Sequence, residues 1–299
     1  MSGNSAEARG EASAGGHNEI PVLMSVHGGI DPEHFRQAVC SVLNQSYGRV
    51  ALYLMLDGQQ TESVQLILAG IDDRRLTVVS SQHNRGLAES LNALLERALP
   101  RNHRYVARMD ADDVSLPERF AAQLSYLQSH EEIGVLGTAC IEVDEGGRRI
   151  GIVRKPETHA ELRALVSTGN PFIHPSVMFR ASVFTDGTRY PTRFRLAEDI
   201  GLWVSLLEKG VQFANLSEPL LLFRRTRATV GRRRGIGNAW PETYHRLRSL
   251  RIPGQFSAGR MGMIGAMFLT RLLPVPALEV CYRLQRGALS RLYRRLAAG

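Results

Sequence analysis

The chain has 299 residues, of which 43% are hydrophobic, so it can bury a sizeable core in one large or two modest domains. Its cysteines are far apart and odd in number, which argues against a disulfide framework and favours reduced thiols in a cytosolic setting: Cys40, Cys140 and Cys281. No stretch reaches the roughly 18 uninterrupted apolar residues of a membrane-spanning helix. Residues 261–280 come closest, but an arginine and two prolines interrupt them.

Charge is distributed unevenly along the chain. The net charge is +8, yet the segment from Arg224 to the end carries 16 arginines and two acids, a net charge of +14, and residues 1–223 carry −6. This imbalance predicts an acidic partner for the C-terminal segment, either nucleic acid or anionic lipid. The alternative is a general bias of composition, since 35 of the 37 basic residues are arginine.

The first part of the chain alternates short apolar strands with amphipathic helices. Residues 1–19 are rich in Gly, Ser, Ala and Glu and predict a disordered tail rather than a signal peptide. Asp31 and Pro32 then start a helix, because Asp is a favoured N-cap and Pro a favoured first helical residue. Strands are expected at 20–26, 50–56, 76–81 and 105–110, and further helices at 63–71 and 87–99.

This order predicts a parallel, doubly wound sheet with right-handed crossovers, in which ligands bind outside the carboxyl ends of the strands. Polar residues follow three of the expected strands at that edge. They are the segment 25–27, Asp57, and an acidic cluster that begins at Asp110. We therefore expect these groups to converge.

Beyond residue 120 the pattern is less regular. The elements expected there are a helix at 120–129, one long strand or a strand pair at 133–144, a turn at 145–149, a strand ending the segment 170–179, and a helix at 198–210. Glu198 and Asp199 lie in the first turn of the last helix, where acids complement the helix dipole.

The stretch RMDADDVSLPERF, residues 108–120, places three carboxylates in four positions. Such a cluster is unfavourable unless a positive group lies among the side chains, and a divalent cation with oxygen ligands is one such group. The alternative is a turn that caps the next helix, since Ser115 and Glu118 have the spacing of a capping box. That alternative does not require the three aspartates.

Five motifs occur in a recognisable order: LMLDGQQT, NRGLAESLN, RMDADD, NPFIHPSVMFR and AEDIGLWVSLLEKG. Together, from about Ile20 to Arg225, they resemble the bacterial family 2 glycosyltransferases that build exopolysaccharide or O-antigen units. The resemblance implies a GT-A fold, a Rossmann-like doubly wound mixed sheet. It also implies an inverting, metal-dependent transfer from a nucleotide-sugar, expected to be a UDP-sugar, to a saccharide or lipid-linked saccharide acceptor, with Mn²⁺ or Mg²⁺ as cofactor.

On the donor side the resemblance assigns roles to individual positions. Asp57 matches the aspartate that hydrogen-bonds uracil; its alternative role is that of a turn residue before a glycine. Ser25 and His27 match the segment that lines base and ribose, although His27 can equally be an incidental loop residue. Arg85 matches a loop beside the nucleotide.

The metal site is assigned in the same way. Asp112 would hold the cation that bridges the two phosphates, and Asp110 would contact the ribose or a metal-bound water, whereas Asp113 is left with either a metal-binding or a loop-shaping role. Many relatives carry a histidine after the last core strand, and this chain has none there. Arginines between Arg225 and Arg234 are candidates for supplying positive charge in a loop that closes over the donor.

On the acceptor side, Glu198 and Asp199 match the family's acidic pair, in which the aspartate is the general base. Trp203 can stack on a sugar face or belong to the core. His174 matches a position near the acceptor pocket, with an open role.

We expect a disordered tail at 1–19, a catalytic domain at 20–223, and an Arg-rich helical extension at 224–299 that can associate with a membrane. Within the domain, 20–115 would bind the nucleotide and 116–223 the acceptor. The basic amphipathic pattern of 277–299 suits either anionic lipid or packing on the domain. We expect the protein in the cytoplasm, in a peripheral position on the inner face of the cytoplasmic membrane. We expect no nucleic-acid partner.

Two other functions are alternatives to the transferase. A non-catalytic protein that binds polyanions or lipid through the tail would not need the aspartates. A sugar nucleotidyltransferase would need a glycine-rich loop with a basic residue soon after the first strand, but Gly28 and Gly29 have no Lys or Arg nearby before Arg36.

Overall fold

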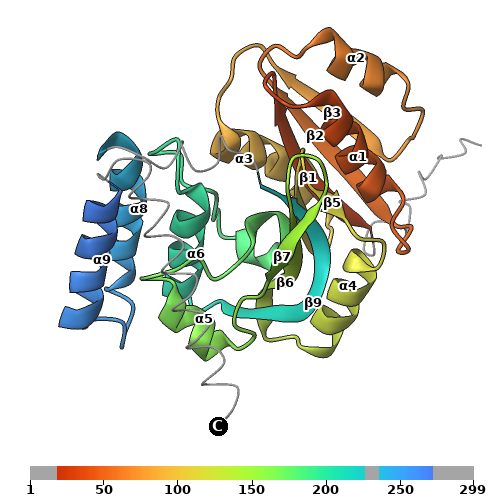
Figure 1. The fold of residues 1–299 in the computed structure, drawn as a ribbon. Coiled ribbons are helices and arrows are strands. Elements are labelled where there is room, and N and C mark those ends of the chain that lie inside the picture. The colour runs from red at the N-terminus through yellow and green to blue at the C-terminus, as the bar shows by residue number, and fades with distance from the viewer. Residues whose placement is uncertain (1–18, 226–235, 272–299) are drawn as a thin grey trace, which may run out of the picture.

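The computed structural model describes residues 19–225 and 236–271 (Figure 1). The predicted tail at 1–19, except for Glu19, and the basic amphipathic segment at 277–299 lie outside these ranges. In the described part of the chain, none of the helices combines the length and the apolar character needed to cross a bilayer.

A single nine-stranded mixed sheet forms the centre, with strand order β3-β2-β1-β4-β8-β6-β9-β5 and with β7 paired to β6. Strands β3, β2, β1 and β4 are parallel, as the β-α-β-α pattern predicts. Strand β8 runs antiparallel to both β4 and β6 and makes the sheet mixed. The strands are β1 (Ile20–His27), β2 (Val50–Asp57), β3 (Leu76–Ser81), β4 (Tyr105–Asp110), β5 (Val114–Ser115), β6 (Ile133–Val143), β7 (Arg149–Val153), β8 (Met178–Arg180) and β9 (Gln212–Arg224).

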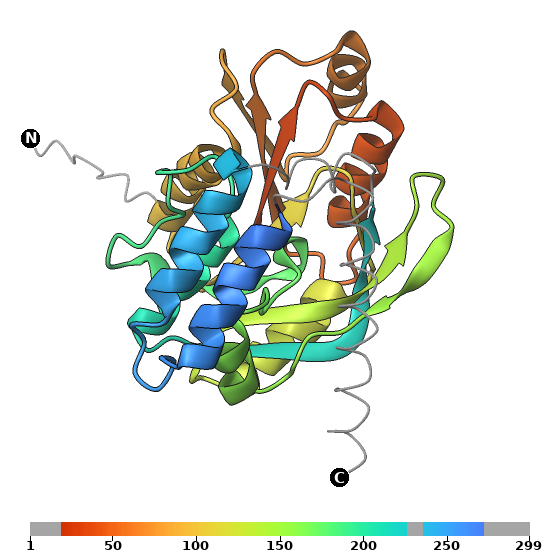
Figure 2. The same cartoon turned by 60° about the vertical axis from the view of Figure 1, so that its left-hand side comes forward.

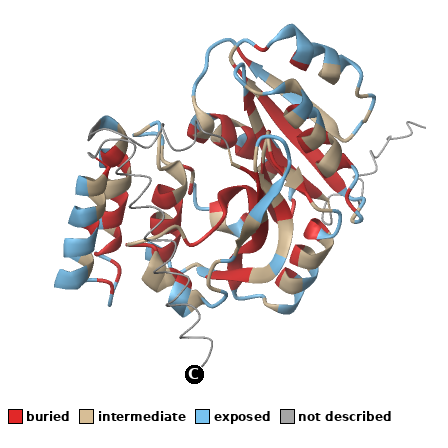
Figure 3. Ribbon diagram, in the orientation of Figure 1, coloured by how far each residue is buried: buried red, intermediate tan, exposed pale blue. Residues whose placement is uncertain are grey.

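Helices cover both faces of the sheet, and two hydrophobic cores result because side chains alternate between faces along each strand. One core joins the sheet to α3 (Leu87–Ala98), α5 (His159–Leu165) and α6 (Glu198–Glu208). The other joins it to α1 (Pro32–Leu43), α2 (Glu62–Ala69) and α4 (Arg119–Ser129). Figure 3 shows buried residues along the central strands and on the helix sides that face them.

Helix boundaries follow local chemistry in some places and tertiary pairing in others. The Asp31 carboxylate accepts hydrogen bonds from the backbone of Glu33 and His34 at 2.9 and 3.0 Å, which confirms the predicted N-cap of α1. The capping box expected at Ser115 is wrong. Ser115 is buried in β5, which pairs with β9, and α4 begins at Arg119 without a side-chain cap.

Two further helices, α8 (Ile236–Ser249) and α9 (Ala258–Thr270), form an outer layer beside α6 (Figures 1 and 2). Helix α8 packs on α6, and α9 packs on α8. Gly201 permits the close approach of α6 and α8, because a Cβ atom there would lie 2.7 Å from Cε1 of His245. The outer layer is therefore attached to the helix that carries Glu198 and Asp199.

Candidate active site

The carboxyl ends of four parallel strands meet at one edge of the sheet, as the topology predicts. Register places Ser25 beside Asp110, His27 beside Asp57, and Asp57 beside Ser81. The polar groups singled out in the sequence after the first, second and fourth strands are thus neighbours. The edge is where open α/β sheets bind ligands.

Asp57 fastens this edge to the loop before α3. Its side chain is buried, and its two oxygens accept hydrogen bonds from the backbone N–H groups of Arg85 and Gly86 at 2.7 and 2.9 Å. The Arg85 side chain is exposed and lines a hollow of about 300 Å³ together with Asn84 and Arg195. The carboxylate therefore holds the loop in place, and each oxygen keeps a second lone pair for a further donor.

Asp110, Asp112 and Asp113 form the acidic cluster, and each offers a carboxylate oxygen that lies within 4.8 Å of the others. Burial, reinforced by the Asp110 charge, raises the pKa of Asp112 to about 6 and that of Asp113 well above its ordinary range. Oδ2 of Asp113 is buried and has no hydrogen-bond partner among the described residues. A compact set of oxygen donors with an unsatisfied member fits a hard divalent cation such as Mg²⁺ or Mn²⁺.

Asp113 also shapes the loop. Its Oδ1 accepts a hydrogen bond from the backbone N–H of Arg224 at 2.7 Å, and Arg224 Nε donates to the carbonyl of Asp112 at 2.9 Å. These contacts tie the end of β9 to the acidic cluster. The two roles left open for Asp113 are compatible, because each uses a different oxygen.

Arg108, which the sequence analysis missed, is the buried cation of the site. It precedes Asp110 by two residues on β4, so both side chains lie on the same face of the strand. Its Nη2 donates to Oδ1 of Asp110, and its Nε and Nη1 have no partner within the described ranges. Strand alternation next to a recognised acidic motif was the signal that could have found it.

Glu198 and Asp199 open α6. The residue before them, Ala197, has φ 65°, in the left-handed region that non-glycine residues rarely occupy. Burial, followed by the Asp199 charge, raises the pKa of Glu198 to about 7, while the positive charge of Arg108 opposes this shift. The charge of Arg108 thus acts on both carboxylate groups of the site.

Two hydrogen bonds, one from a side chain and one from the backbone, fix the Asp199 carboxylate. Asn170 Nδ2 donates to Asp199 Oδ2 at 2.5 Å, and the backbone N–H of Ile200 donates to Oδ1 at 2.7 Å. Asn170 begins the recognised segment NPFIHPSVMF, but no sequence pattern favours it over His174. Its contact with Asp199 depends on tertiary structure.

The two candidates for the acceptor side, His174 and Trp203, are both buried. The prediction that Trp203 can stack on a sugar face is therefore wrong. The Trp203 ring is fully buried against Phe172 and Phe179, so the core alternative is confirmed. His174 is also buried and its Nε2 lies 3.1 Å from the Tyr190 hydroxyl. Burial, with a further effect of Arg108, lowers the pKa of His174 well below its ordinary value and keeps the ring neutral.

His27 is exposed at the rim, where its Nδ1 accepts from the backbone N–H of Gly29 at 3.1 Å. Of the arginine run at 225–234, only Arg225 is among the described residues, and its backbone N–H donates to the carbonyl of Val143.

Comparison with solved structures agrees with this architecture. S. aureus TarS residues 1–349 in complex with UDP-GlcNAc superposes with a TM-score of 0.62 at 15% identity, covering 85% of this chain and 72% of that one. The mannosyltransferase PcManGT from Pyrobaculum calidifontis, in complex with GDP-Man and Mn²⁺, superposes with a TM-score of 0.58 at 16% identity, covering 93% and 82%. The fold is that of GT-A glycosyltransferases, as expected.

Sequence comparison gives the family. The amylovoran biosynthesis glycosyltransferase AmsE of Erwinia amylovora is 32% identical over 89% of this chain and 98% of its own length. The UDP-Gal:alpha-D-GlcNAc-diphosphoundecaprenol beta-1,3-galactosyltransferase of Escherichia coli is 25% identical over 77% of this chain and 84% of its own. The family model described as glycosyl transferase family 2 matches residues 22–187. The chain therefore belongs to glycosyl transferase family 2.

Proposed function

We propose that the chain transfers a sugar from a UDP-sugar to a lipid-linked saccharide in cell-surface polysaccharide synthesis, with inversion at the anomeric carbon. Family membership makes this reaction class a better account than the sugar nucleotidyltransferase or the non-catalytic polyanion binder. The E. coli relative's name contains both a UDP-sugar and a diphosphoundecaprenol acceptor, and the S. aureus neighbour binds UDP-GlcNAc.

One observation carries the proposal. Two carboxylate groups from distant parts of the chain, the cluster at Asp110–Asp113 and the pair at Glu198–Asp199, lie near enough for the buried charge of Arg108 to act on both, which supports a single site. The first suits a cation and a diphosphate, and the second suits proton removal from a hydroxyl group. The proposed inverting, metal-dependent transfer uses both.

The reaction would proceed as a single displacement. Asp199, oriented by Asn170, takes the proton of the acceptor hydroxyl, and the oxygen forms a bond to the anomeric carbon of the donor sugar. The bond between that carbon and the diphosphate oxygen breaks on the opposite face, so the configuration inverts and the nucleoside diphosphate leaves. Burial and the Asp199 charge favour the protonated form of Glu198, which limits the negative charge beside the proposed base, and Arg108 opposes this shift in the pKa of Glu198.

Asp112, with Asp110 and Asp113, would hold Mn²⁺ or Mg²⁺, which when bound compensates negative charge on the departing diphosphate. At the adjacent strand ends, Asp57 would accept from the uracil ring through its free lone pairs. Ser25 and His27 would lie along the base and ribose, and Arg85 beside the nucleotide.

In this assignment, residues 20–115 bind the nucleotide-sugar donor and residues 116–223 bind the acceptor. The extension at 224–299 would bring the enzyme to the inner face of the cytoplasmic membrane, where a lipid-linked acceptor is located. The net charge of +14 from Arg224 onward supports that location.

A panel of nucleotide-sugars tests the proposal. We expect one UDP-sugar to raise the melting temperature in the presence of Mn²⁺ and to be hydrolysed slowly without acceptor. The Asp112→Asn variant should lose both effects. A panel in which no nucleotide-sugar binds or reacts, with or without metal, would overturn the assignment.

A further inference from the structure

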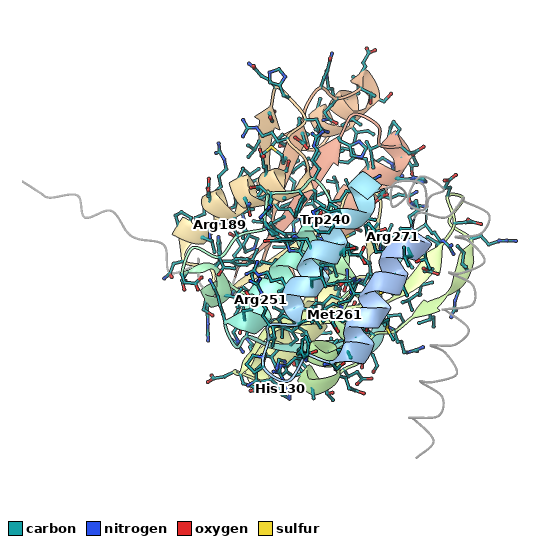
Figure 4. All side chains as sticks on the ribbon, turned by 90° about the vertical axis from the view of Figure 1, so that its left-hand side faces the viewer. His130, Arg189, Trp240, Arg251, Met261 and Arg271 are labelled. Carbon is teal, nitrogen blue, oxygen red and sulfur yellow. The ribbon has the colours of Figure 1, made fainter. Side chains whose placement is uncertain are left out.

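The α8–α9 pair and the connection between its helices, here called the α8–α9 face, expose an unusual number of large apolar side chains. Of the nine that the described residues expose, six lie on this pair or its connection, each between 39% and 67% exposed: Trp240, Leu247, Phe256, Met261, Met263 and Leu269. Figure 4 looks onto the two helices, with Trp240 toward one end and Met261 toward the other. Soluble surfaces seldom gather apolar side chains in this way unless something binds there.

The α8–α9 pair is positively charged overall. From Ile236 to Arg271 the sequence holds five arginines and one acid, Glu242. Three of these arginines are neutralised by carboxylates of Glu242 and Glu208, whereas Arg251 and Arg260 have no carboxylate partner in the described ranges. The face is therefore apolar, with unpaired cations at its margin.

We propose that this face docks on the surface of an anionic lipid bilayer. The inference rests on the proposed function and identifies the surface through which the enzyme would contact the membrane. Exposed Phe, Met and Leu enter the boundary between headgroups and acyl chains, Trp240 suits the interface, and the arginines meet lipid phosphates. Such a surface lies on the membrane without spanning it.

Charge decides between lipid and the other possible occupants. The sequence that follows α9, residues 272–299, carries five arginines and one acid. Packing that segment on the face, or pairing two copies of the face, would bring arginines against arginines, whereas an anionic bilayer attracts both sets. An anionic bilayer is therefore the occupant that both the exposed apolar side chains and the positive charge favour.

The position of the face fits delivery of an acceptor. Helix α8 lies between it and α6, and His245 of α8 contacts Gly201, two residues after Asp199. Rings of Tyr244 and His245 also pack on Phe194, in the segment that leads to Glu198. A bilayer on this face would lie one helix away from the base.

Flotation of the full chain with vesicles tests the proposal. The matched variants are Phe256→Ser/Met263→Ser/Leu269→Ser and, as control, Leu66→Ser/Ile150→Ser, which removes side chains of similar exposure from other faces. With phosphatidylcholine vesicles that contain about 30% phosphatidylglycerol, the triple variant should bind at least about tenfold more weakly than wild type, and the control as wild type. Melting temperatures show whether each variant is folded. Arg251→Gln is a second test: it leaves the apolar side chains intact and should also weaken binding to the vesicles.

Equal flotation of wild type and triple variant, or no flotation of wild type, would overturn the proposal. So would a dimer in light scattering that the triple variant converts to monomer without any lipid effect. Turnover of a water-soluble acceptor reports on the proposed function separately, because the triple variant should keep it while failing to float.

Discussion

Asn170 and Asp199 are 29 residues apart in sequence, yet Nδ2 of the amide donates to Oδ2 of the carboxylate at 2.5 Å. Oδ1 of the same amide accepts from Nε1 of Trp203 at 3.1 Å, so a fully buried indole fixes the direction of the amide. The proposed base is thus oriented from inside the core, and the recognised segment around residues 170–179 acquires a physical role.

Replacing Asn170 with Ala removes this orientation. A hydrogen bond to a charged group is worth about 1.5–3 kcal/mol, so kcat should fall about 10- to 100-fold while the KM for the donor changes little. The control is Asn92→Ala, whose amide makes two hydrogen bonds to the Tyr190 backbone and touches no carboxylate. Equal kcat for the Asn170 variant and wild type would show that the contact is only structural.

Divalent cations should stabilise the protein through the acidic cluster. At a Mn²⁺ concentration of about 100 times Kd the gain is about 2.7 kcal/mol, which corresponds to roughly 5–10 °C in Tm. Asp112→Asn should abolish this shift and, because it removes a buried like charge, should raise the Tm of the metal-free protein. The exposed Asp72→Asn should behave as wild type; a full Mn²⁺ shift in the Asp112 variant would place the cation elsewhere.

Stability should depend on the ionisation of Glu198. Folding raises the pKa of this carboxyl from 4.5 to about 7, so the folded state holds its proton more tightly and the unfolded state ionises first. The free energy of unfolding should therefore fall as pH rises from 4.5 to about 7 and level off above it. In chelator at pH 8, Glu198→Gln should be more stable than wild type by about 1–3 kcal/mol, measured by urea denaturation. The exposed Glu96→Gln is the control, and an unchanged pH profile in the Glu198 variant would contradict the assignment.

Two helical glycines should respond oppositely to alanine. At Gly201 a Cβ atom would lie 2.5 Å from Pro191 Cγ and 2.7 Å from His245 Cε1, so Gly201→Ala should lower stability by about 1–3 kcal/mol. At Gly265 a Cβ atom meets nothing within 4 Å, and Gly265→Ala should raise stability by up to about 1 kcal/mol. Thermal melts of both variants test the packing of α8 on α6, and equal shifts of the same sign would contradict it.

The parallel half of the sheet could be predicted because its rules are local. Short apolar runs, helical periodicity and the Asp31 cap each act within a few residues, and chain order then determines which strand ends meet. The helix expected at 120–129 agrees with α4, but the strand role of Ser115 was missed because its pairing with Leu221 depends on a strand more than 100 residues away. No local sequence pattern predicts such a distant strand partner.

The same distinction between local patterns and tertiary contacts applies to the residues of the candidate site. Asp57 and the Asp110–Asp113 cluster were found because they follow strands directly. Asn170 and Arg224 were missed because each acts through a partner brought near by folding. Arg108 was missed although its partner Asp110 is only two residues away on β4, where strand alternation is a local signal. Trp203 shows the opposite failure: its spacing from Asp199 gave no information on which direction the ring points.

Turnover by Asp199→Asn tests the central claim most directly, because the change removes the proposed base and keeps the size and shape of the side chain. With the UDP-sugar found by the panel and a lipid-linked acceptor, the variant should bind UDP and Mn²⁺ as wild type does in calorimetry while kcat falls at least about 100-fold. Binding without turnover would support Asp199 as the base that activates the acceptor. Turnover at the wild-type rate would contradict the account.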